Sequence, residues 1–312
     1  NTQNATMAKQ WALKELSTLA DSKGQAHSYE SRLERVKTIS QIPYGKTTPF
    51  PIQLSHSLKE RTEFMNQFRQ QLDRCTYGQA HLKSRLEKKL SQLISNPDAK
   101  GQCLLLLGPP GTGKTSIIRD GIAKTLGWHC AEIPLSGVED ASLLIGNGPV
   151  WEGSKPGEIL RHSIRAQSEN MLIFFDEVDK CGKGHHGDAV LQNLVQITDF
   201  TQNNQFRDLH IPEAPIDLSK CIFVFTANTL STIPTPLLNR MEILEIKPQS
   251  IKEKTMIGLH YLLPKIYEQN KFTCGDIHID NDTMTYIISN CPFEAGSRSL
   301  KRILETIIET LN

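Results

Sequence analysis

The fold of this chain is decided by the stretch Gly108-Pro109-Pro110-Gly111-Thr112-Gly113-Lys114-Thr115. The stretch has the pattern G-x-x-x-x-G-K-[ST], and it lies between the apolar run Cys103–Leu107 and a helical pattern. Its glycines let the backbone curl so that successive N–H groups point inward, and the start of the helix adds positive potential. We therefore expect a phosphate-binding loop; a glycine-rich turn without a ligand is the alternative.

The residues of this loop have separate expected roles in binding a nucleotide with Mg²⁺. We expect the Lys114 ammonium to reach the β- and γ-phosphates and the Thr115 hydroxyl to ligate the metal. The rest of the loop is expected to surround the phosphates, through Pro110, Gly111, Thr112 and Gly113.

Two acidic residues, Asp176 and Glu177, end the apolar run Met171–Phe175. A buried strand that ends in carboxylates places them at the edge where open α/β sheets bind ligands. We expect Asp176 to hold Mg²⁺, directly or through water, and Glu177 to polarise the water that attacks the γ-phosphate. Without the phosphate-binding loop, the same pair would be read as part of a solvated loop.

Short apolar runs alternate with helical patterns in the middle of the chain. Helical patterns lie near 115–126, 157–168 and 188–198, and the runs are Cys103–Leu107, Ala131–Leu135, Met171–Phe175, Cys221–Phe225 and Ile243–Ile246. Strands that alternate with helices are typical of a parallel sheet covered on both faces. We therefore predict the α/β fold class.

Helical periodicity dominates both ends of the chain. Residues 5–38 have it with a break at 22–24, and it returns at 57–72 and 79–95 after a proline-rich linker. After Pro248, Ser250 is a plausible N-cap for a helix to about 270, and the last helix has one apolar stripe. We predict a helical N-terminal arm and linker (1–55), a large α/β nucleotide-binding domain (56–248) and a small helical C-terminal lid domain (249–312).

Composition excludes several classes of protein. The chain has 312 residues, and 35 Lys and Arg against 34 Asp and Glu give a net charge of +1. No global basic field therefore favours nucleic acid or an anionic membrane. The longest apolar stretches fall far short of the roughly 20 residues that span a bilayer. Seven scattered cysteines without a C-x-x-C pair argue against a disulfide framework or a structural zinc site, and they favour a reducing compartment.

Three further polar residues are candidates for contact with the γ-phosphate. Asn228 follows the strand Cys221–Phe225, where its amide could bond both the phosphate and the attacking water; capping the next turn is the alternative. Arg240 and Arg298 could each stabilise charge on the transferring phosphoryl group. Most arginines are surface or salt-bridge residues, so spacing alone favours such a role for both.

Two weaker signals have simpler explanations. Cys181, His185 and His186 lie in a Gly- and Lys-rich segment without a suitably spaced fourth ligand, so we expect a polar loop rather than a metal site. A basic cluster lies beside the leucine stripe of 79–95 and is expected to be a solvated helix face. Its members are Lys83, Arg85, Lys88 and Lys89.

Together, these segments resemble the ATPase module of Lon-family proteases, within the AAA+ superfamily. The resemblance runs from about residue 28 to the end and is specific to Lon from about 72 to 300. In the family's order, the matching segments are Leu72-Asp73, Tyr77-Gly78, Gly108–Thr115, Asp176–Lys180, Gly187-Asp188, Gln202–Asn204, Asp217–Lys220, Thr226–Thr229, Leu237–Glu242 and Glu294–Gly296. The resemblance implies a P-loop AAA+ fold with ATP and Mg²⁺ as cofactors.

The resemblance also implies roles that spacing does not determine. Asn228 is similar to sensor 1, and Arg298 is similar to sensor 2 of the small domain. Arg240 is similar to the arginine finger, which in this superfamily acts on ATP bound to a neighbouring subunit; this implies a homo-oligomeric ring, in this family a hexamer. Tyr77 and Gly78 are similar to part of the adenine pocket.

One stretch departs from the family at the loop that threads polypeptide substrates. The family's pore loop carries an aromatic residue followed by an aliphatic one, and the aligned positions here are Trp151 and Glu152. An exposed tryptophan in a glycine-rich loop suits apolar contact with a polypeptide. A tryptophan packed into its own domain is the alternative, and Glu152 replaces the aliphatic partner.

The resemblance implies Mg-ATP hydrolysis that drives unfolding and translocation of proteins. The family's Ser–Lys protease domain would lie beyond Asn312, and no G-x-S-x-G motif occurs here, so we do not expect these residues to cut peptide bonds. We expect a piece of a Lon-like protease of the cytoplasm or mitochondrial matrix. A stand-alone remodeller or nucleotide switch is the alternative, and the balanced charge argues against a DNA-handling AAA+ protein.

Overall fold

The computed structural model describes residues 2–21, 26–96, 101–148, 153–182, 185–271, 277–292 and 294–311. The chain divides into two compact units. The first unit comprises Asn1–Pro51, Asn96–Leu105 and Leu126–Glu242, and the second comprises Ile52–Ser95, Leu106–Thr125 and Ile243–Asn312. The predicted domains 1–55, 56–248 and 249–312 follow other boundaries, and they stay a prediction.

A parallel sheet of five strands forms among the described residues, in the order β2-β3-β4-β1-β5. β2 and β3 are aligned from Cys130 with Leu172 to Pro134 with Asp176, and β3 and β4 from Leu172 with Ile222 to Phe175 with Phe225. The strands are β1 (Cys103–Leu107), β2 (Cys130–Pro134), β3 (Leu172–Asp176), β4 (Ile222–Ala227) and β5 (Glu242–Glu245). The predicted α/β class is confirmed, and every predicted strand begins and ends within two residues of an observed one.

The strands form because their apolar runs bury both faces. Every residue of β4 is buried, as are the first four residues of β3. The rings of Phe175 and Phe225 stack with centroids 4.8 Å apart, and Phe223 is fully buried against Phe200. Neighbouring strands with large apolar side chains on both faces leave little surface for water, which favours this central position in the sheet.

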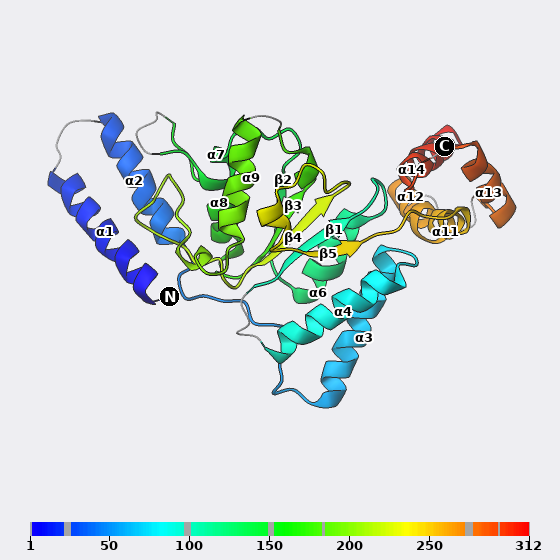
Figure 1. Cartoon of the computed structure of the whole chain (residues 1–312), viewed down its shortest axis with the longest axis horizontal. Helices are drawn as coiled ribbons and strands as arrows, with labels where there is room; N and C mark the ends of the chain where they lie inside the picture. The colour runs from blue at the N-terminus through cyan, green and yellow to red at the C-terminus, as the bar shows by residue number, and fades with distance from the viewer. Residues whose placement is uncertain are drawn as a thin grey trace. The chain divides into compact units, whose positions relative to one another are not determined.

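The first unit also contains the N-terminal helices. Residues 5–38, which were predicted to be helical, form α1 (Thr2–Asp21) and α2 (Ala26–Gln41), which lie side by side in Figure 1. The linker that follows is bound to this unit, because Thr48 N donates to Asn170 Oδ1 at 2.7 Å. The remaining helical segments of the unit are α7 (Ser142–Ile145), η2 (Val178–Lys180), α8 (Glu158–Ala166), α9 (His185–Ile197), η3 (Asn203–Gln205) and α10 (Thr235–Leu238).

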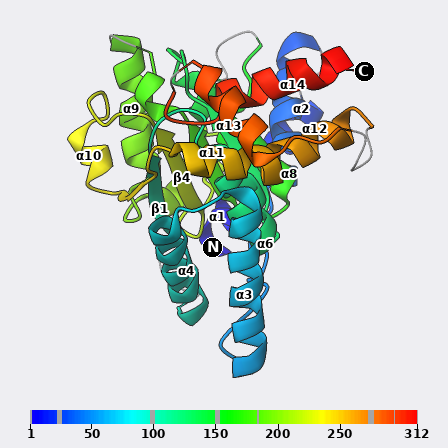
Figure 2. The ribbon, with the colours of Figure 1, turned by 90° about the vertical axis from the view of Figure 1, so that its right-hand side faces the viewer.

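The second unit begins with the paired helices α3 (Leu58–Cys75) and α4 (Ala80–Ser95), seen side by side in Figures 1 and 2. The phosphate-binding loop leads into a continuous helical segment. This segment is formed by α5 (Lys114–Ser116), the π-helical η1 (Ile117–Ala123) and α6 (Lys124–Leu126), which reaches the boundary between the units. The loop is therefore followed by a helix, as its motif predicts.

A helical bundle completes the second unit. Ser250 caps α11 (Ile251–Ile257) in a capping box with Glu253, as predicted, and the helix continues through η4 (Gly258–Leu262) and α12 (Leu263–Gln269). α13 (Asn281–Asn290) and α14 (Arg298–Leu311) follow. The predicted apolar stripe of the last helix forms the core of the bundle, through Leu300, Leu304 and Ile308. In the part of the chain that the structure describes, no helix is long and apolar enough to cross a membrane.

Candidate nucleotide-binding site

The phosphate-binding loop of the second unit has the backbone that its glycines predict. Gly111 and Gly113 have left-handed φ values of 76° and 89°, which residues with a Cβ atom rarely adopt. Gly113 is the N-cap of α5, and its carbonyl accepts a hydrogen bond from Ile117 N at 3.0 Å. Thr112 is buried, and its hydroxyl donates to Pro109 O at 2.8 Å. The loop is therefore held in its curled form by its own atoms.

Lys114 lies folded over this loop. Its ammonium donates to Gly108 O at 2.6 Å and to Pro109 O at 3.0 Å. These carbonyls keep a cation beside the N–H groups of the loop, where negative phosphate oxygens would be stabilised. Thr115 follows at the first turn of the helix and is half-buried. The residues therefore fit a triphosphate, with a hydroxyl oxygen of the kind that Mg²⁺ prefers.

The segment before α14 packs directly on the loop within the same unit. Ser297 N donates to Gly111 O at 3.0 Å, and a Cβ added to Gly296 would lie 2.3 Å from Pro110 O. A Cβ on Gly111 would lie 3.1 Å from both the Cβ and the N of Arg298. The structure thus brings the predicted sensor 2 residue, which is exposed, to the phosphate-binding loop.

The predicted adenine-binding residues lie beside the loop and the bundle of the second unit. The ring of Tyr77 meets that of Tyr261 edge to face, with centroids 6.4 Å apart. Gly78 has a left-handed φ of 67°, and a Cβ there would lie 3.0 Å from Glu253 Oε1. The hydroxyl of Thr76 would be 3.9 Å from a Cβ on Gly113. Residues 76–78 therefore connect α3, the loop and α11.

Lys83 corrects the prediction of a solvated basic face on α4. Its side chain is buried, with 3% of its surface exposed, and its ammonium donates to Asp73 Oδ1 at 2.6 Å and Thr76 O at 2.7 Å. A buried ammonium needs such partners because desolvation is costly. Lys83 therefore fixes the end of α3 that leads into Tyr77. The sequence pattern does not predict this role, because only the tertiary fold shows which of the four basic residues is buried.

The first unit contains the predicted acidic pair and sensor 1. The Thr226 hydroxyl donates to Asp176 Oδ1 and accepts from Glu177 N at 2.9 Å. This pairing fixes the two carboxylates at the carboxyl ends of the neighbouring strands β3 and β4. Glu177 has φ 55° and ψ 49°, a left-handed conformation that costs a non-glycine residue about 1–2 kcal/mol and is characteristic of functional positions.

Asp179 holds the segment that carries Asn228. Its Oδ2 accepts from Asn228 N at 3.0 Å and from Thr229 N at 3.2 Å, and its carbonyl accepts from the Thr232 hydroxyl at 2.9 Å. Asp179 belongs to the Lon-like segment Asp176–Lys180, and its sequence position alone predicts no role for it. Its position three residues after Asp176 was the available signal, because a helical turn there returns the side chain toward the next strand.

Two of the predicted catalytic residues are paired with charges of the first unit. Lys180 Nζ lies 2.5 Å from Glu177 Oε1. Arg240 donates to Asp199 Oδ2 at 3.0 Å and to Pro236 O at 3.1 Å. The pKa of Asp199 is lowered, first by hydrogen bonds from Thr201 and then by Arg240. Arg240 is therefore held by a carboxylate of the same unit, one whose lowered pKa favours the ionised form.

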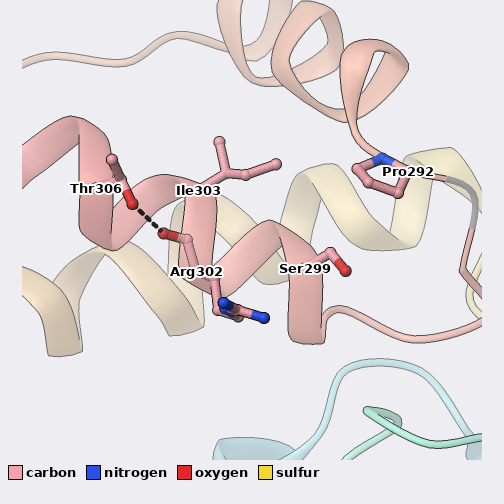
Figure 3. Close-up of a pocket in the computed structure, with 5 residues that line it drawn as sticks. All are labelled: Pro292, Ser299, Arg302, Ile303 and Thr306. Atoms are coloured by element: carbon pink, nitrogen blue, oxygen red, sulfur yellow. Dashed lines mark hydrogen bonds between the residues drawn. The ribbon is translucent and has the colours of Figure 1, made fainter.

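The remaining sequence candidates have different outcomes. Trp151 and Glu152 lie outside the described residues, as do the side chains of His185 and His186. Cys181 is buried, and burial raises the pKa of its thiol. No group of three or more metal-ligating side chains occurs within the described ranges. A pocket of about 290 Å³ in the second unit contains none of the predicted nucleotide-binding residues; it is lined by Pro292, Ser299, Arg302, Ile303 and Thr306 (Figure 3).

Comparison with known families identifies the class of protein. Residues 104–249 match the family described as "ATPase family associated with various cellular activities (AAA)". This range begins inside β1 and ends one residue before the N-cap of α11, and so includes the phosphate-binding loop, the acidic pair, Asn228 and Arg240. The chain therefore contains an AAA ATPase domain.

Individual relatives are Lon proteases. The chain is 34% identical over 308 residues, 98% of its length, to Lon protease homolog 2, peroxisomal, of Oryza sativa subsp. indica. It is 36% identical over 270 residues to Lon protease of Clostridioides difficile, and 34% over 273 residues to Lon protease homolog, mitochondrial, of Schizosaccharomyces pombe; each match covers 86% of this chain. These matches cover 33%, 32% and 24% of the relatives, so the chain spans about a third of their length or less. The resemblance to the Lon ATPase module is confirmed.

The contact between Gly296 and the loop leads to a first prediction. Gly296→Ala places a methyl group 2.3 Å from Pro110 O, so the loop backbone must move. We expect the affinity for a fluorescent adenine nucleotide to fall by about tenfold or more, because the curled loop is what aligns the N–H groups. Gly148→Ala, where a Cβ meets nothing within 4 Å, is the matched control. Equal dissociation constants for the two variants would contradict this reading.

A second prediction concerns Lys83. Lys83→Met removes the charge that holds Asp73 and Thr76 O, and we expect the KM for ATP to rise by about tenfold while kcat changes by less than about twofold. The reason is that Lys83 orients the adenine-side segment without touching the phosphates. Lys88→Met, at an exposed position of the same helix, serves as the control. A fall in kcat without a change in KM would remove Lys83 from this role.

Proposed function

We propose that this chain binds and hydrolyses Mg-ATP, and that hydrolysis drives the unfolding and translocation of protein substrates. The observation that carries the proposal is the phosphate-binding loop with Arg298 and Lys114 packed on it in one unit. The AAA match and the Lon relatives support the same conclusion. The chain is accordingly proposed as the motor module of a Lon-like ATP-dependent serine protease whose peptidase domain these residues do not supply.

The proposed roles follow from the side chains. Backbone N–H groups around Gly111 and Gly113, with Lys114, bind the phosphates. Thr115 and Asp176 supply oxygen ligands for Mg²⁺, which neutralises charge on the phosphates when bound. Glu177 takes up the proton of the attacking water, and Asn228 orients that water.

Arg298 and Arg240 are proposed to stabilise the charge that develops on the transferred phosphoryl group. We propose that Arg240 acts on ATP of a neighbouring subunit, in a homo-oligomeric ring that is a hexamer. Its pairing with Asp199 supports this proposal, because a carboxylate fixes the direction in which the long side chain leaves the first unit. An arginine supplied in this way can be worth about 10³–10⁵ in rate in related chemistry.

The substrate and the setting are also proposals. Trp151 and Glu152 are proposed to contact the polypeptide substrate. None of the six cysteines that the structure describes forms a disulfide, which agrees with a reducing compartment, the cytoplasm or the mitochondrial matrix. A motor and a nucleotide switch differ in one measurable respect: unfolded casein accelerates ATP hydrolysis by a motor and leaves a switch unchanged.

The catalytic carboxylate is tested by Glu177→Gln. We expect hydrolysis to fall by about a hundredfold or more with ATP affinity within about twofold of the wild type, because the amide keeps the shape but cannot accept the proton. Steady-state hydrolysis and nucleotide titration measure the two effects. Glu245→Gln, exposed in β5, controls for loss of a surface charge. Turnover close to that of the wild type in Glu177→Gln would remove this residue from the mechanism.

The action of Arg240 on a neighbouring subunit is tested by mixing. Arg240→Ala should bind ATP normally and lose hydrolysis by about 10³-fold or more. If the residue acts in trans, Arg240→Ala mixed with Glu177→Gln should regain part of the activity in mixed rings. Arg165→Ala, at an exposed position of α8, provides the control for the substitution itself. Wild-type hydrolysis by chains shown by mass measurement to be monomeric would exclude the trans role.

A further inference from the structure

A buried carboxyl group outside all the motifs lies in the first unit, at Asp208. Its residue is 2% exposed, and its two oxygens accept separate backbone hydrogen bonds. Oδ2 accepts from Gly157 N at 2.8 Å, and Oδ1 accepts from His210 N at 2.9 Å. Gly157 is the N-cap of α8, so the carboxylate also lies where the helix dipole favours a negative charge. The predicted mechanism of ATP hydrolysis makes no use of this group.

Asp208 holds together the two ends of the segment that leads from α7 to α8. We call these ends, Ile145–Asn147 and Ser154–Gly157, the loop stem. A Cβ on Gly146 would lie 2.4 Å from Asp208 Oδ1, and one on Gly157 would lie 2.6 Å from Gly146 N. Asn147 N donates to Lys155 O at 3.1 Å, which closes the stem. Glycine is required at both ends because the carboxylate and the two backbones meet without space for side chains.

His210 adds a second attachment on the same side of the stem. Its Nδ1 lies 2.8 Å from the Ser154 hydroxyl, which also donates to Asn147 O at 2.6 Å. The next residue before it, Leu209, donates its N–H to Ile145 O at 2.6 Å. His210 is 1% exposed, so these bonds are shielded from competition with water.

The N-terminal helices support this attachment from the other side. Arg35 of α2 donates from Nε to His210 O at 3.0 Å and pairs with Glu213 at 2.7 Å. The same guanidinium lies 4.7 Å from the centre of the Trp11 ring of α1. A continuous chain of contacts therefore runs from α1 and α2 through His210 to the loop stem.

We propose that Asp208 is a positioning residue that clamps the loop stem, so that the segment between its ends starts and finishes at a fixed place for contact with a polypeptide. The inference rests on the proposed function, which places substrate contact in that segment. The two oxygens of one carboxyl group accept from a helix N-cap and from a neighbouring turn at the same time, which a side chain with a single acceptor oxygen does not do.

The clamp should respond to pH near neutrality. Burial raises the pKa of Asp208 to about 7, although hydrogen bonds from His210 and Gly157 oppose the shift. The charged and titratable groups around the clamp are Arg35 and Glu34 of α2, Glu213, and His210, whose pKa is lowered by burial and then by Arg35. Because the raised pKa means that the closed clamp binds the proton more tightly than a solvated Asp208 would, the clamp is expected to loosen as the pH rises through about 7 and to be tighter below it.

Hydrogen exchange of the full chain measures the clamp directly. In Asp208→Asn, we expect peptides covering 153–161 to exchange about tenfold faster or more, because one amide of the pair loses its charged acceptor. After correction for intrinsic rates, wild-type protection should fall between about pH 6 and 8, as Asp208 ionises, whereas that of the variant should not change. Asp217→Asn is the matched control, since Asp217 accepts from Ser219 N in a similar turn. Unchanged protection, or the same pH dependence in Asp208→Asn, would overturn the proposal.

An ATPase assay with unfolded casein separates the clamp from the proposed function. We expect Asp208→Asn to keep basal hydrolysis within about twofold and to lose at least about fivefold of the stimulation by casein, through a raised KM for casein. Equal loss of basal and stimulated activity would show a general structural effect and refute the positioning role. If casein fails to stimulate the wild type, the proposed function fails, and hydrogen exchange still decides the clamp. Ser154→Ala removes one hydroxyl of the stem in a variant less prone to misfolding. It should lose part of the protection and of the stimulation by casein, and it should keep the pH dependence that comes from Asp208.

Discussion

The close approach of two backbones determines much of the second unit. Gly296 and Ser297 pack on Pro110 and Gly111 without an intervening side chain, and Ser297 N is bonded to Gly111 O. α14 begins at the next residue and continues into the core of the helical bundle. Since this contact has no flexible side chain to absorb displacement, a shift of the phosphate-binding loop must move the start of α14 as well. The loop and the bundle are therefore mechanically coupled by direct backbone contact and by this hydrogen bond.

Charged side chains with little exposure hold the functional segments in place. Lys83 bonds the carbonyl before Tyr77, Asp179 bonds the N–H of Asn228, and Asp208 bonds the N–H of Gly157. In each case the partner is backbone, so the charge fixes the course of a segment rather than the position of one side chain. Removing such a group leaves a polar backbone atom without its partner, which costs more than the bond itself contributes. Irregular segments next to a sheet need this kind of support because they have no regular set of backbone hydrogen bonds of their own.

In the role proposed for Arg240, its pairing with Asp199 has two consequences. The carboxylate limits the rotamers of a long side chain and so reduces the entropy lost when the guanidinium meets a phosphate. It also competes with that phosphate for the same N–H groups. A triphosphate carries more negative charge than the diphosphate left after its hydrolysis, so in the proposed role it competes with Asp199 for Arg240 more strongly than the diphosphate does. Lys180 likewise forms an ion pair with Glu177, another residue of the predicted catalytic site.

By itself, the sequence determined the α/β class, the five strands, the phosphate-binding loop and the capping by Ser250, because each depends on local periodicity or on residues that are neighbours in the chain. The assignment of Asn228, Arg240 and Arg298 needed the family resemblance, since their partners are distant in sequence. Only the tertiary structure decided that Lys83 is buried, that Asp179 supports Asn228, and that Asp208 joins Gly146 to Gly157. The physical reason is that any local sequence pattern predicts a charged residue to be exposed to solvent. Only the packing of distant segments shows which charged side chains are shielded from water and bonded to the backbone.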